Sequence, residues 1–278
     1  MSAETASPAE RDGAEVYRSI MMSEPPDPGD PFTSSLLDYV FAQVWVRPGL
    51  SRRDRRWVSL TCAGAADTVE PIEQHVYAAL RSGDMSLLAM EEFVLHFAVY
   101  CGWPKASLLN QVVAVQWAQV CQDRGEPPPH PEEVPAWSPG LDPGLRMQRG
   151  RDWFAYINCV DGPPPVTPYL GAGILNYVFG EVWQRPGMSD KDRRMVTVAA
   201  VGLDDTEIPI RSHVYAALKS GDVTLEEMQE LVLHFAVHSG WPKASFLDQV
   251  TSESWRRIES EGGVRDPRPA PPRGLGDR

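Results

Sequence analysis

An internal repeat constrains this chain more than any other feature. Sliding the sequence by 138 positions aligns residues 39–112 with residues 177–250 without a gap, and about 45 of these 74 pairs are identical. With a shift of 137 the match continues toward the N-terminus, where Gly13 and Tyr17 align with Gly150 and Phe154. The 278 residues therefore contain two copies of one unit of roughly 110 residues.

Composition shifts mark the boundaries between the two units. We expect a first domain over residues 13–124 and a second over residues 149–260. The intervening residues 125–148 include the stretch EPPPHPEEVPAWSPGLDPG, whose prolines and polar residues are typical of a semi-rigid linker. Residues 261–278 contain DPRPAPPRGLGDR, which predicts a disordered tail.

The local signals within each unit are helical. Apolar residues recur with a helical period from Ser34 to Trp45. Ser51 opens the sequence SRRD and Ser189 opens SDKD at the equivalent position, so each predicts an N-cap with an acidic residue three positions on. Thr224 begins another capping box. Since no useful length alternates with a period of two, the sequence predicts an all-α protein.

Several of these segments resemble a known family. YVFGEVWQRPGMSDKDRRMVTVAA, RSHVYAALKSG and LVLHFAVHSGWPKA are similar to the carboxymuconolactone decarboxylase family, which shares its helical fold with alkylhydroperoxidase-D-like proteins. The similarity covers about two thirds of the chain. It implies two tandem helical domains of this kind that form a pseudo-dimer. The wider group includes cofactor-free decarboxylases of a carboxylated lactone and thiol-dependent reductases.

The sequence argues against the reductase chemistry of that group. Such reductases need a Cys-x-x-Cys pair, yet residues 72–78 read IEQHVYA and residues 210–216 read IRSHVYA. The four cysteines are scattered along the chain, which favours reduced thiols over a disulfide framework. We therefore expect neither a thiol peroxidase nor a disulfide reductase. The cysteines are Cys62, Cys101, Cys121 and Cys159.

A decarboxylase without a cofactor must hold a carboxylate, stabilise negative charge and protonate carbon. Arginine suits the first task and histidine suits the others, since its pKa lies near neutrality. We expect His213 and His234 to transfer protons, with Arg185 or Arg211 holding the anion. The full set of catalytic candidates is His213, His234, Glu230, Glu181, His75 and His96, and that of substrate-binding candidates is Arg185, Arg211, Trp183, His238, Lys243, Arg47 and Tyr100.

The two units differ at positions that matter for an acidic substrate. The second unit has Glu181 and Arg211, which fit the decarboxylase pattern that the resemblance implies, whereas the first has Gln43 and Glu73. Exchanging a cation for an anion would repel a carboxylate. The second unit is therefore the predicted active one.

One helix face also suggests a metal site. Glu230, His234 and His238 are spaced i, i+4 and i+8, so all three lie on one side of a helix. The first copy has Tyr100 in place of the last donor. We therefore expect no metal and no cofactor, with Glu230 orienting His234 through a hydrogen bond.

Three functions stay open on these residues. The favoured one is a cofactor-independent lyase that decarboxylates a small carboxylated substrate of the cyclic or lactone type. An isomerase, hydratase or ring-rearranging enzyme would use the same acid-base groups. A non-catalytic binding or scaffold protein would instead use the histidines and the recurring tryptophans as core residues.

Charge and hydropathy limit the partners and the location. The net charge is −12 and no basic stripe with interleaved aromatic residues occurs, so nucleic acid is not expected. The N-terminus MSAETASPAERDGAE lacks a secretory pattern and no apolar run could span a membrane, which predicts a cytoplasmic location. The partners expected are a small-molecule carboxylate and, as the resemblance implies, two further copies in a homotrimer of tandem chains, a pseudo-hexamer.

Overall fold

The computed structural model is built of helices, and it describes residues 12–127, 142–204, 206–265 and 269–272. Most of the predicted linker, residues 128–141, and parts of the predicted tail, residues 266–268 and 273–278, lie outside the described residues. The linker prediction is wrong at its C-terminal end, because a helix begins at Pro143, capped by Asp142. The described part of the chain contains no strand, so the all-α prediction is confirmed.

The two units contribute nearly the same succession of elements, except that α2 occurs only in the first and η3 only in the second. The first comprises α1 (Gly13–Met21), α2 (Pro31–Ser35), η1 (Leu36–Trp45), α3 (Arg52–Ala66), α4 (Val69–Arg81), α5 (Leu87–Cys101) and α6 (Trp103–Arg124). The second comprises α7 (Pro143–Asn158), η2 (Tyr169–Val178), η3 (Val182–Gln184), α8 (Asp190–Leu203), α9 (Glu207–Lys219), α10 (Leu225–Ser239) and α11 (Trp241–Ser260).

Most of the helix ends follow the expected caps. The Ser51 side chain accepts a hydrogen bond from the Asp54 amide, and full capping boxes start α8 at Ser189 and α10 at Thr224. Gly83 adopts a left-handed φ of +76° just after α4. The predicted helix from Ser34 to Trp45 differs in detail, because Leu36–Trp45 and Tyr169–Val178 are π-helices.

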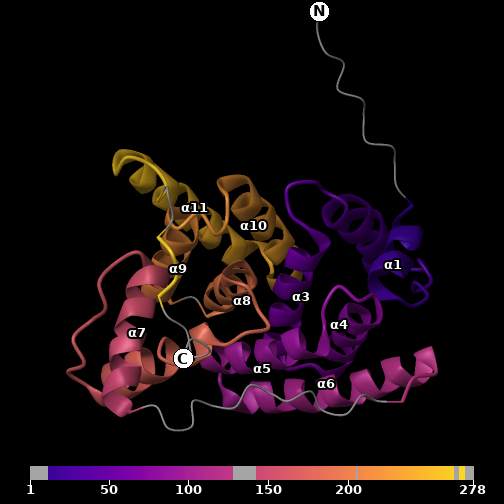
Figure 1. Ribbon diagram of the computed structural model, residues 1–278. Coiled ribbons are helices and arrows are strands. Elements are labelled where there is room, and N and C mark those ends of the chain that lie inside the picture. The colour runs from indigo at the N-terminus through magenta and orange to yellow at the C-terminus, as the bar shows by residue number, and fades with distance from the viewer. Residues whose placement is uncertain (1–11, 128–141, 205, 266–268, 273–278) are drawn as a thin grey trace, which may run out of the picture.

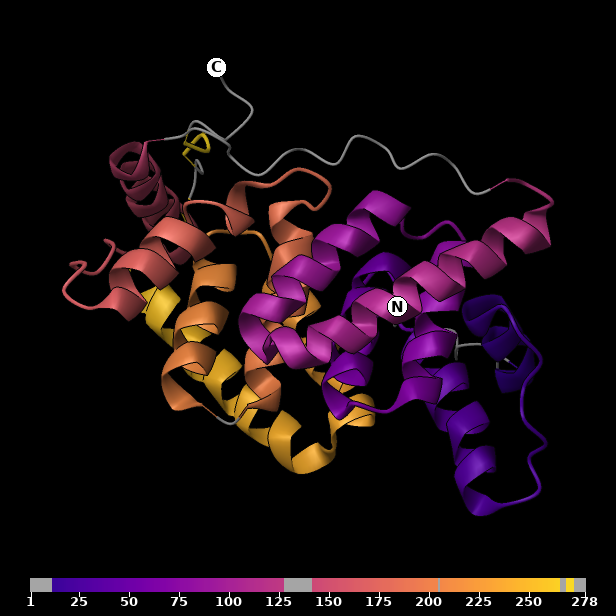
Figure 2. The same cartoon turned by 90° about the horizontal axis from the view of Figure 1, so that it is seen from below.

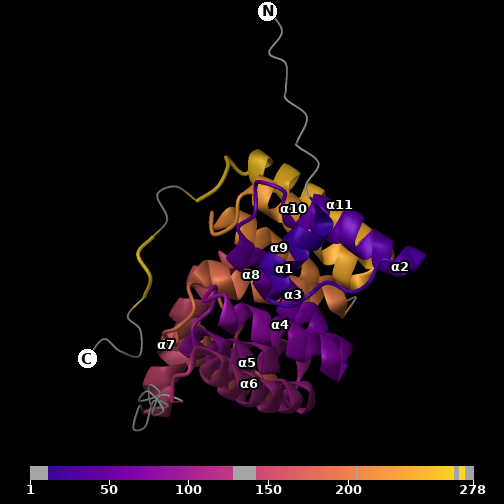
Figure 3. The same cartoon turned by 90° about the vertical axis from the view of Figure 1, so that its right-hand side faces the viewer.

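The halves exchange helices around a common centre. The α3 and α8 helices pack against each other, with α10 of the second half on α3 and α5 of the first half on α8. The α5–α6 and α10–α11 hairpins lie on opposite sides of this pair, and α1 and α7 lie at opposite ends (Figures 1 and 3). Figure 2 shows α5 and α6 side by side across the lower face. The chain is therefore an intertwined pseudo-dimer.

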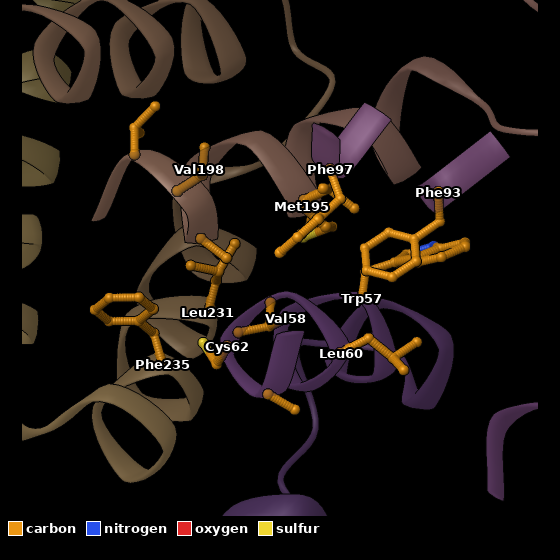
Figure 4. Packing of buried hydrophobic residues seen from close by; sticks show 14 of the residues in the cluster. Trp57, Val58, Leu60, Cys62, Phe93, Phe97, Met195, Val198, Leu231 and Phe235 are labelled. Carbon is orange, nitrogen blue, oxygen red and sulfur yellow. The ribbon is translucent and has the colours of Figure 1, made fainter. Parts of the chain in front are cut away.

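One continuous apolar core joins the two halves. It includes Trp57 and Val58 of α3, Met195 of α8, Phe97 of α5 and Phe235 of α10, none of them exposed. Figure 4 shows these side chains converging from all four helices. Since burying such side chains contributes about 1.5 to 3 kcal/mol each, the halves depend on each other for stability.

Ion pairs reinforce the exchange. Arg185, which follows η3, binds Glu92 of α5 through Nε and Nη2 at 2.9 and 2.6 Å. Arg47 makes the equivalent pair with Glu230 of α10 at the same two distances. The first pair is buried, with side chains 5% and 3% exposed, whereas the Arg47 side chain is 48% exposed.

This difference predicts unequal costs for the same substitution. Arg185→Gln should lower the free energy of unfolding by about 3 to 5 kcal/mol, because it removes the cation that is bound to the buried carboxylate of Glu92. Arg47→Gln should cost less, since water reaches Arg47 and Glu230 keeps its ion pair with the buried Arg55 at 3.1 Å. Urea unfolding followed by circular dichroism measures both. Equal costs would contradict this assignment.

Candidate functional site

Two clusters of polar side chains lie where the halves meet. We call His96, Tyr100, Thr197, Trp183 and His213 the Tyr100 site, and their repeat equivalents His234, His238, Ser59, Trp45 and His75 the His238 site. Each cluster takes two residues from α5 or α10 of one half and the others from the opposite half. Neither site is complete within one unit.

A hydrogen-bonded chain runs through the Tyr100 site. An Arg193 nitrogen lies 3.3 Å from His96 Nδ1, and His96 Nε2 lies 2.9 Å from Thr197 Oγ1. Because a guanidinium can only donate, Nδ1 is the acceptor and Nε2 carries the proton that bonds to Thr197. The buried His96 is thus held in one tautomer.

Tyr100 continues this chain toward His213. Its hydroxyl accepts hydrogen bonds from Trp183 Nε1, at 3.0 Å, and from Thr197. Burial raises the pKa of Tyr100, and these two hydrogen bonds partly offset that rise. The Tyr100 ring meets His213 edge to face, with centroids 5.4 Å apart.

His213 is a neutral base at physiological pH. Burial, with a smaller contribution from the Arg194 charge, lowers the pKa of His213 to about 3. Its Nδ1 atom is buried and has no hydrogen-bond partner within the described residues. A neutral imidazole has one unprotonated nitrogen, at which it can accept a proton or a hydrogen bond.

The His238 site has a different arrangement. Ser59 Oγ lies between two imidazoles, 2.8 Å from His234 Nε2 and 2.9 Å from His238 Nε2. The ring of His75 meets that of His238 with centroids 5.6 Å apart. Burial lowers the pKa of His238 to about 4. Three neutral histidines thus replace the two histidines and one tyrosine of the other site.

A cavity of about 560 Å³ opens beside the Tyr100 site. His213 and Arg211 of α9 line it together with Arg257 of α11. The rest of the wall is mainly apolar and comes from α7, the loop after it, η2 with Phe179 just beyond, and other residues of α9. This size and lining are typical of small-molecule sites.

The comparison with known proteins agrees with this architecture. The model of the Carboxymuconolactone decarboxylase family matches residues 31–114 and 168–253, together more than half of the chain. The chain belongs to the carboxymuconolactone decarboxylase family. Both matched regions fall within the two units of the internal repeat.

Two characterised relatives are decarboxylases. The 4-carboxymuconolactone decarboxylase of Acinetobacter baylyi is 32% identical over 85 residues, which are 31% of this chain and 63% of that protein, so the match spans less than two thirds of its length. Nitrosuccinic acid decarboxylase npaB of Metarhizium robertsii is 31% identical over 128 residues, which are 46% of this chain and 89% of the relative.

The expected pairing of His213 with His234 is wrong. The structure places His213 with Tyr100 and His96 of the other half, while His234 lies with His238 and His75. The reason is the exchange of α5 and α10, which carries each second histidine into the opposite half. In this family member both sites are composite.

Most of the expected substrate cations have structural partners. Arg185 and Arg47 form the ion pairs between halves, and Lys243 donates to the backbone carbonyl of Leu203 near the end of α8. Arg211 differs, since its half-exposed side chain lines the cavity while pairing with Glu207 and Glu253. Of the predicted cations, Arg211 is the one placed to meet a ligand.

The carboxylates also have other roles than expected. Glu230 binds Arg47 and Arg55 and not His234, so the predicted orienting hydrogen bond is wrong. Glu181 is buried beside Arg185, at 3.8 Å. Trp183 is buried against His96 and donates a hydrogen bond to the Tyr100 hydroxyl. It does not line the cavity. Within the described residues no group of His, Cys, Asp or Glu has the arrangement of a metal site.

One residue of α3 and one of α8 contact the histidines, and neither was predicted from the sequence. Thr197 and Ser59 lie at equivalent positions, each following the repeated Asp-Arg-Arg triplet of its unit. The second arginine of each triplet, Arg194 or Arg56, lies over the ring of Trp183 or Trp45. The pair of consecutive arginines recurs at the same place in both copies, and this recurrence was the sequence signal for a site in α3 and α8. In the structure all four arginines are buried, which is rare for this residue type.

Burial makes two of the thiols, Cys62 and Cys101, unreactive near neutrality. It raises the pKa of Cys62 and of Cys101 to about 12, so neither is a thiolate near neutrality. All four cysteines are free.

Among the described helices none is both long and apolar enough to cross a bilayer.

Replacing Tyr100 tests the hydrogen bonding inside its site. Tyr100→Phe should lower the free energy of unfolding by about 1 to 3 kcal/mol, because the buried Trp183 Nε1 loses its acceptor. His238→Tyr should have the opposite sign, since Trp45 Nε1 lacks a partner among the described residues and a tyrosine would supply one. Urea midpoints of the two variants provide the comparison. A lower urea midpoint for His238→Tyr would contradict the assumption that a tyrosine there can bond to Trp45 as Tyr100 bonds to Trp183.

The buried histidines predict a stability that falls on acidification. Their folded pKa values lie below the usual 6.5, to about 3 for His213 and about 4 for His238, so the unfolded chain binds protons first as pH falls. Between pH 7 and pH 5 each should cost up to about 2 kcal/mol of stability. Carboxylates titrate mainly below this range.

Urea midpoints at pH 7 and pH 5 measure this effect. The difference should shrink in His238→Tyr, which removes one of the depressed histidines. Equal midpoints for the unchanged protein at both pH values would contradict it.

Proposed function

We propose that the chain is a cofactor-independent, decarboxylase-like lyase that works at the Tyr100 site. The observation that carries the proposal is the position of His213, which lines the cavity and also meets Tyr100. A molecule in the cavity would therefore contact a neutral base that connects to the Tyr100–Thr197–His96 chain. The decarboxylase names of both relatives favour this class of reaction.

Arg211 would hold the carboxylate of the substrate. Its guanidinium can pair both oxygens of a carboxylate. The existing pairs with Glu207 and Glu253 are exposed, so exchanging one of them for a ligand costs little. Arg257, on the same wall, adds positive charge.

His213 would supply the proton that replaces the carboxylate. A bound anion favours the charged imidazolium, so His213 takes up a proton from solvent as the substrate binds. When the carbon–carbon bond breaks, carbon dioxide leaves and the electron pair remains on carbon, delocalised onto a conjugated oxygen. The imidazolium then protonates that carbon and returns to its neutral form. Tyr100 acts as a positioning residue for this ring.

The His238 site lacks the groups for this chemistry. Repeat alignment places Glu73 where Arg211 lies and Gln119 where Arg257 lies. An acidic substrate would meet repulsion there instead of attraction. The proposed working site is therefore the one on α9, although its His96 and Tyr100 come from the first unit.

Carbon dioxide release from carboxylated lactones and β-keto acids tests this proposal. His213→Ala should lower kcat/KM by about 100-fold or more, because it removes the proton donor. His75→Ala, the matched change in the other site, should stay within about twofold. Equal losses would assign the reaction to both sites, and full activity of His213→Ala would overturn the proposal.

The charge on α9 gives a second test. Arg211→Gln should raise KM about tenfold with a smaller change in kcat, since it weakens carboxylate binding. Glu73→Gln is the matched control and should leave both constants unchanged. Mass analysis of the product separates the reactions: loss of carbon dioxide identifies a lyase, and an unchanged mass would favour the isomerase alternative.

We also propose a homotrimer of tandem chains in the cytoplasm. Trp103 and Trp241 occupy equivalent positions and are 57% and 55% exposed, which supports two equivalent contact surfaces for other copies. Their ring neighbours Tyr177 and Tyr39 lie 5.9 and 6.5 Å away. Light scattering should give three times the chain mass of 30.9 kDa. The double variant Trp103→Ser/Trp241→Ser should have the mass of a single chain. A wild-type monomer would refute the trimer.

A further inference from the structure

We propose that the cavity beside His213 takes a monocarboxylic acid with an extended apolar body, alkyl or aryl, rather than a small acid with several polar groups. The inference rests on the proposed function in taking this cavity as the substrate site. It adds a substrate class, which follows from the chemistry of the wall.

Most of the residues that line the cavity are apolar. Phe154 of α7, Ile174 of η2 and Phe179 just beyond it face the cavity, as does Ile208 at the start of α9. A volume of about 560 Å³ is far more than one carboxyl group needs. A ligand that filled the cavity would bury most of its surface against apolar side chains, which favours a ligand with a large apolar part.

Several polar groups of the wall other than His213 are already engaged within the protein. The Asn158 amide donates to the Phe154 carbonyl and the Ser212 hydroxyl donates to the Pro209 carbonyl, each at 3.1 Å. Arg257 binds Glu261 at 2.7 Å and lies over the Tyr215 ring at 4.0 Å. A ligand with many oxygens would therefore lose hydration without gaining partners.

The positive charge of the wall comes from two helices that pack against each other, α9 and α11. Arg211 and Arg257 supply the positive charges of the wall, and no described lining residue is acidic. One carboxylate is matched by this arrangement, with His213 beside it. A second carboxylate would have to lie against the apolar remainder, at a high desolvation cost.

The other half does not repeat this combination. Repeat alignment puts Glu70 in place of Ile208, Glu73 in place of Arg211 and Gln119 in place of Arg257. Ile208 and both cations thus occur together in the second unit, whereas the equivalent positions of the first unit carry two carboxylates and an amide. A monocarboxylic acid with an apolar body is matched by the first set and not by the second.

Binding of unreactive acids tests the inference without requiring turnover. Butanoate, hexanoate, octanoate and 4-phenylbutanoate are titrated into the full chain by calorimetry, beside succinate and octanamide. Affinity should rise about fourfold per added CH₂ until the cavity is full. Succinate and octanamide should each bind at least tenfold more weakly than octanoate. Equal affinity along the series, or succinate binding as well as octanoate, would overturn the inference.

Matched variants locate the bound acid. Ile174→Asn should flatten the chain-length series, whereas Leu36→Asn, at the equivalent position of the first unit, should leave it as in the wild type. Urea midpoints verify that both variants are folded, and the wild-type series remains decisive if one is not. An unchanged series in folded Ile174→Asn would place the acid elsewhere and overturn the inference.

The two proposals fail separately. A rising series without carbon dioxide release from any activated acid would overturn the decarboxylase and leave the substrate class standing. Release from small polar acids, combined with a flat series, would overturn the substrate class and leave the decarboxylase standing.

Discussion

The packing of α3 against α8 is the constraint on which the rest of the structure depends. These two helices form the centre of one core, and each is covered by a helix from the opposite half, α10 on α3 and α5 on α8. Their N-terminal acids are paired across the same boundary, Asp192 with Arg53 at 3.0 Å and Asp54 with Lys191 at 3.3 Å. Because the apolar faces of both halves are buried together, a single unit would leave much of its core exposed to water.

This exchange also explains how one scaffold holds two unequal sites. The histidines, the tryptophans and the buried arginines recur in both, so the framework of each site is the same. Tyr100 against His238 changes the hydrogen bonding, and Arg211 of α9 against Glu73 of α4 reverses the charge at one repeat position. A fused pair can therefore keep the framework of both sites while the two differ in charge.

The sequence predicted the fold more fully than the site. Repeat length, capping boxes and helical periodicity are local properties, so the helix starts at Ser189 and Thr224 follow from the sequence alone. Which histidines meet is a property of packing between distant helices, and periodicity carries no information about it. The pairing of Arg185 with Glu92 was invisible for the same reason, since the partners are separated along the chain and belong to different units. The asymmetry at Arg211 was predicted, because it needs only the alignment of the repeats.

A double-mutant cycle on kcat/KM tests most directly whether the working site is shared between the halves. Tyr100→Phe and His213→Ala change residues of different halves whose rings are 5.4 Å apart. Their effects should be strongly non-additive, with the double variant little worse than His213→Ala alone. His213→Ala and His234→Gln lie in the same half but in different sites, so their effects should add. Additive effects of Tyr100→Phe and His213→Ala, together with coupling between His213→Ala and His234→Gln, would contradict a shared site. That result would mean that one unit alone supplies the catalytic histidines.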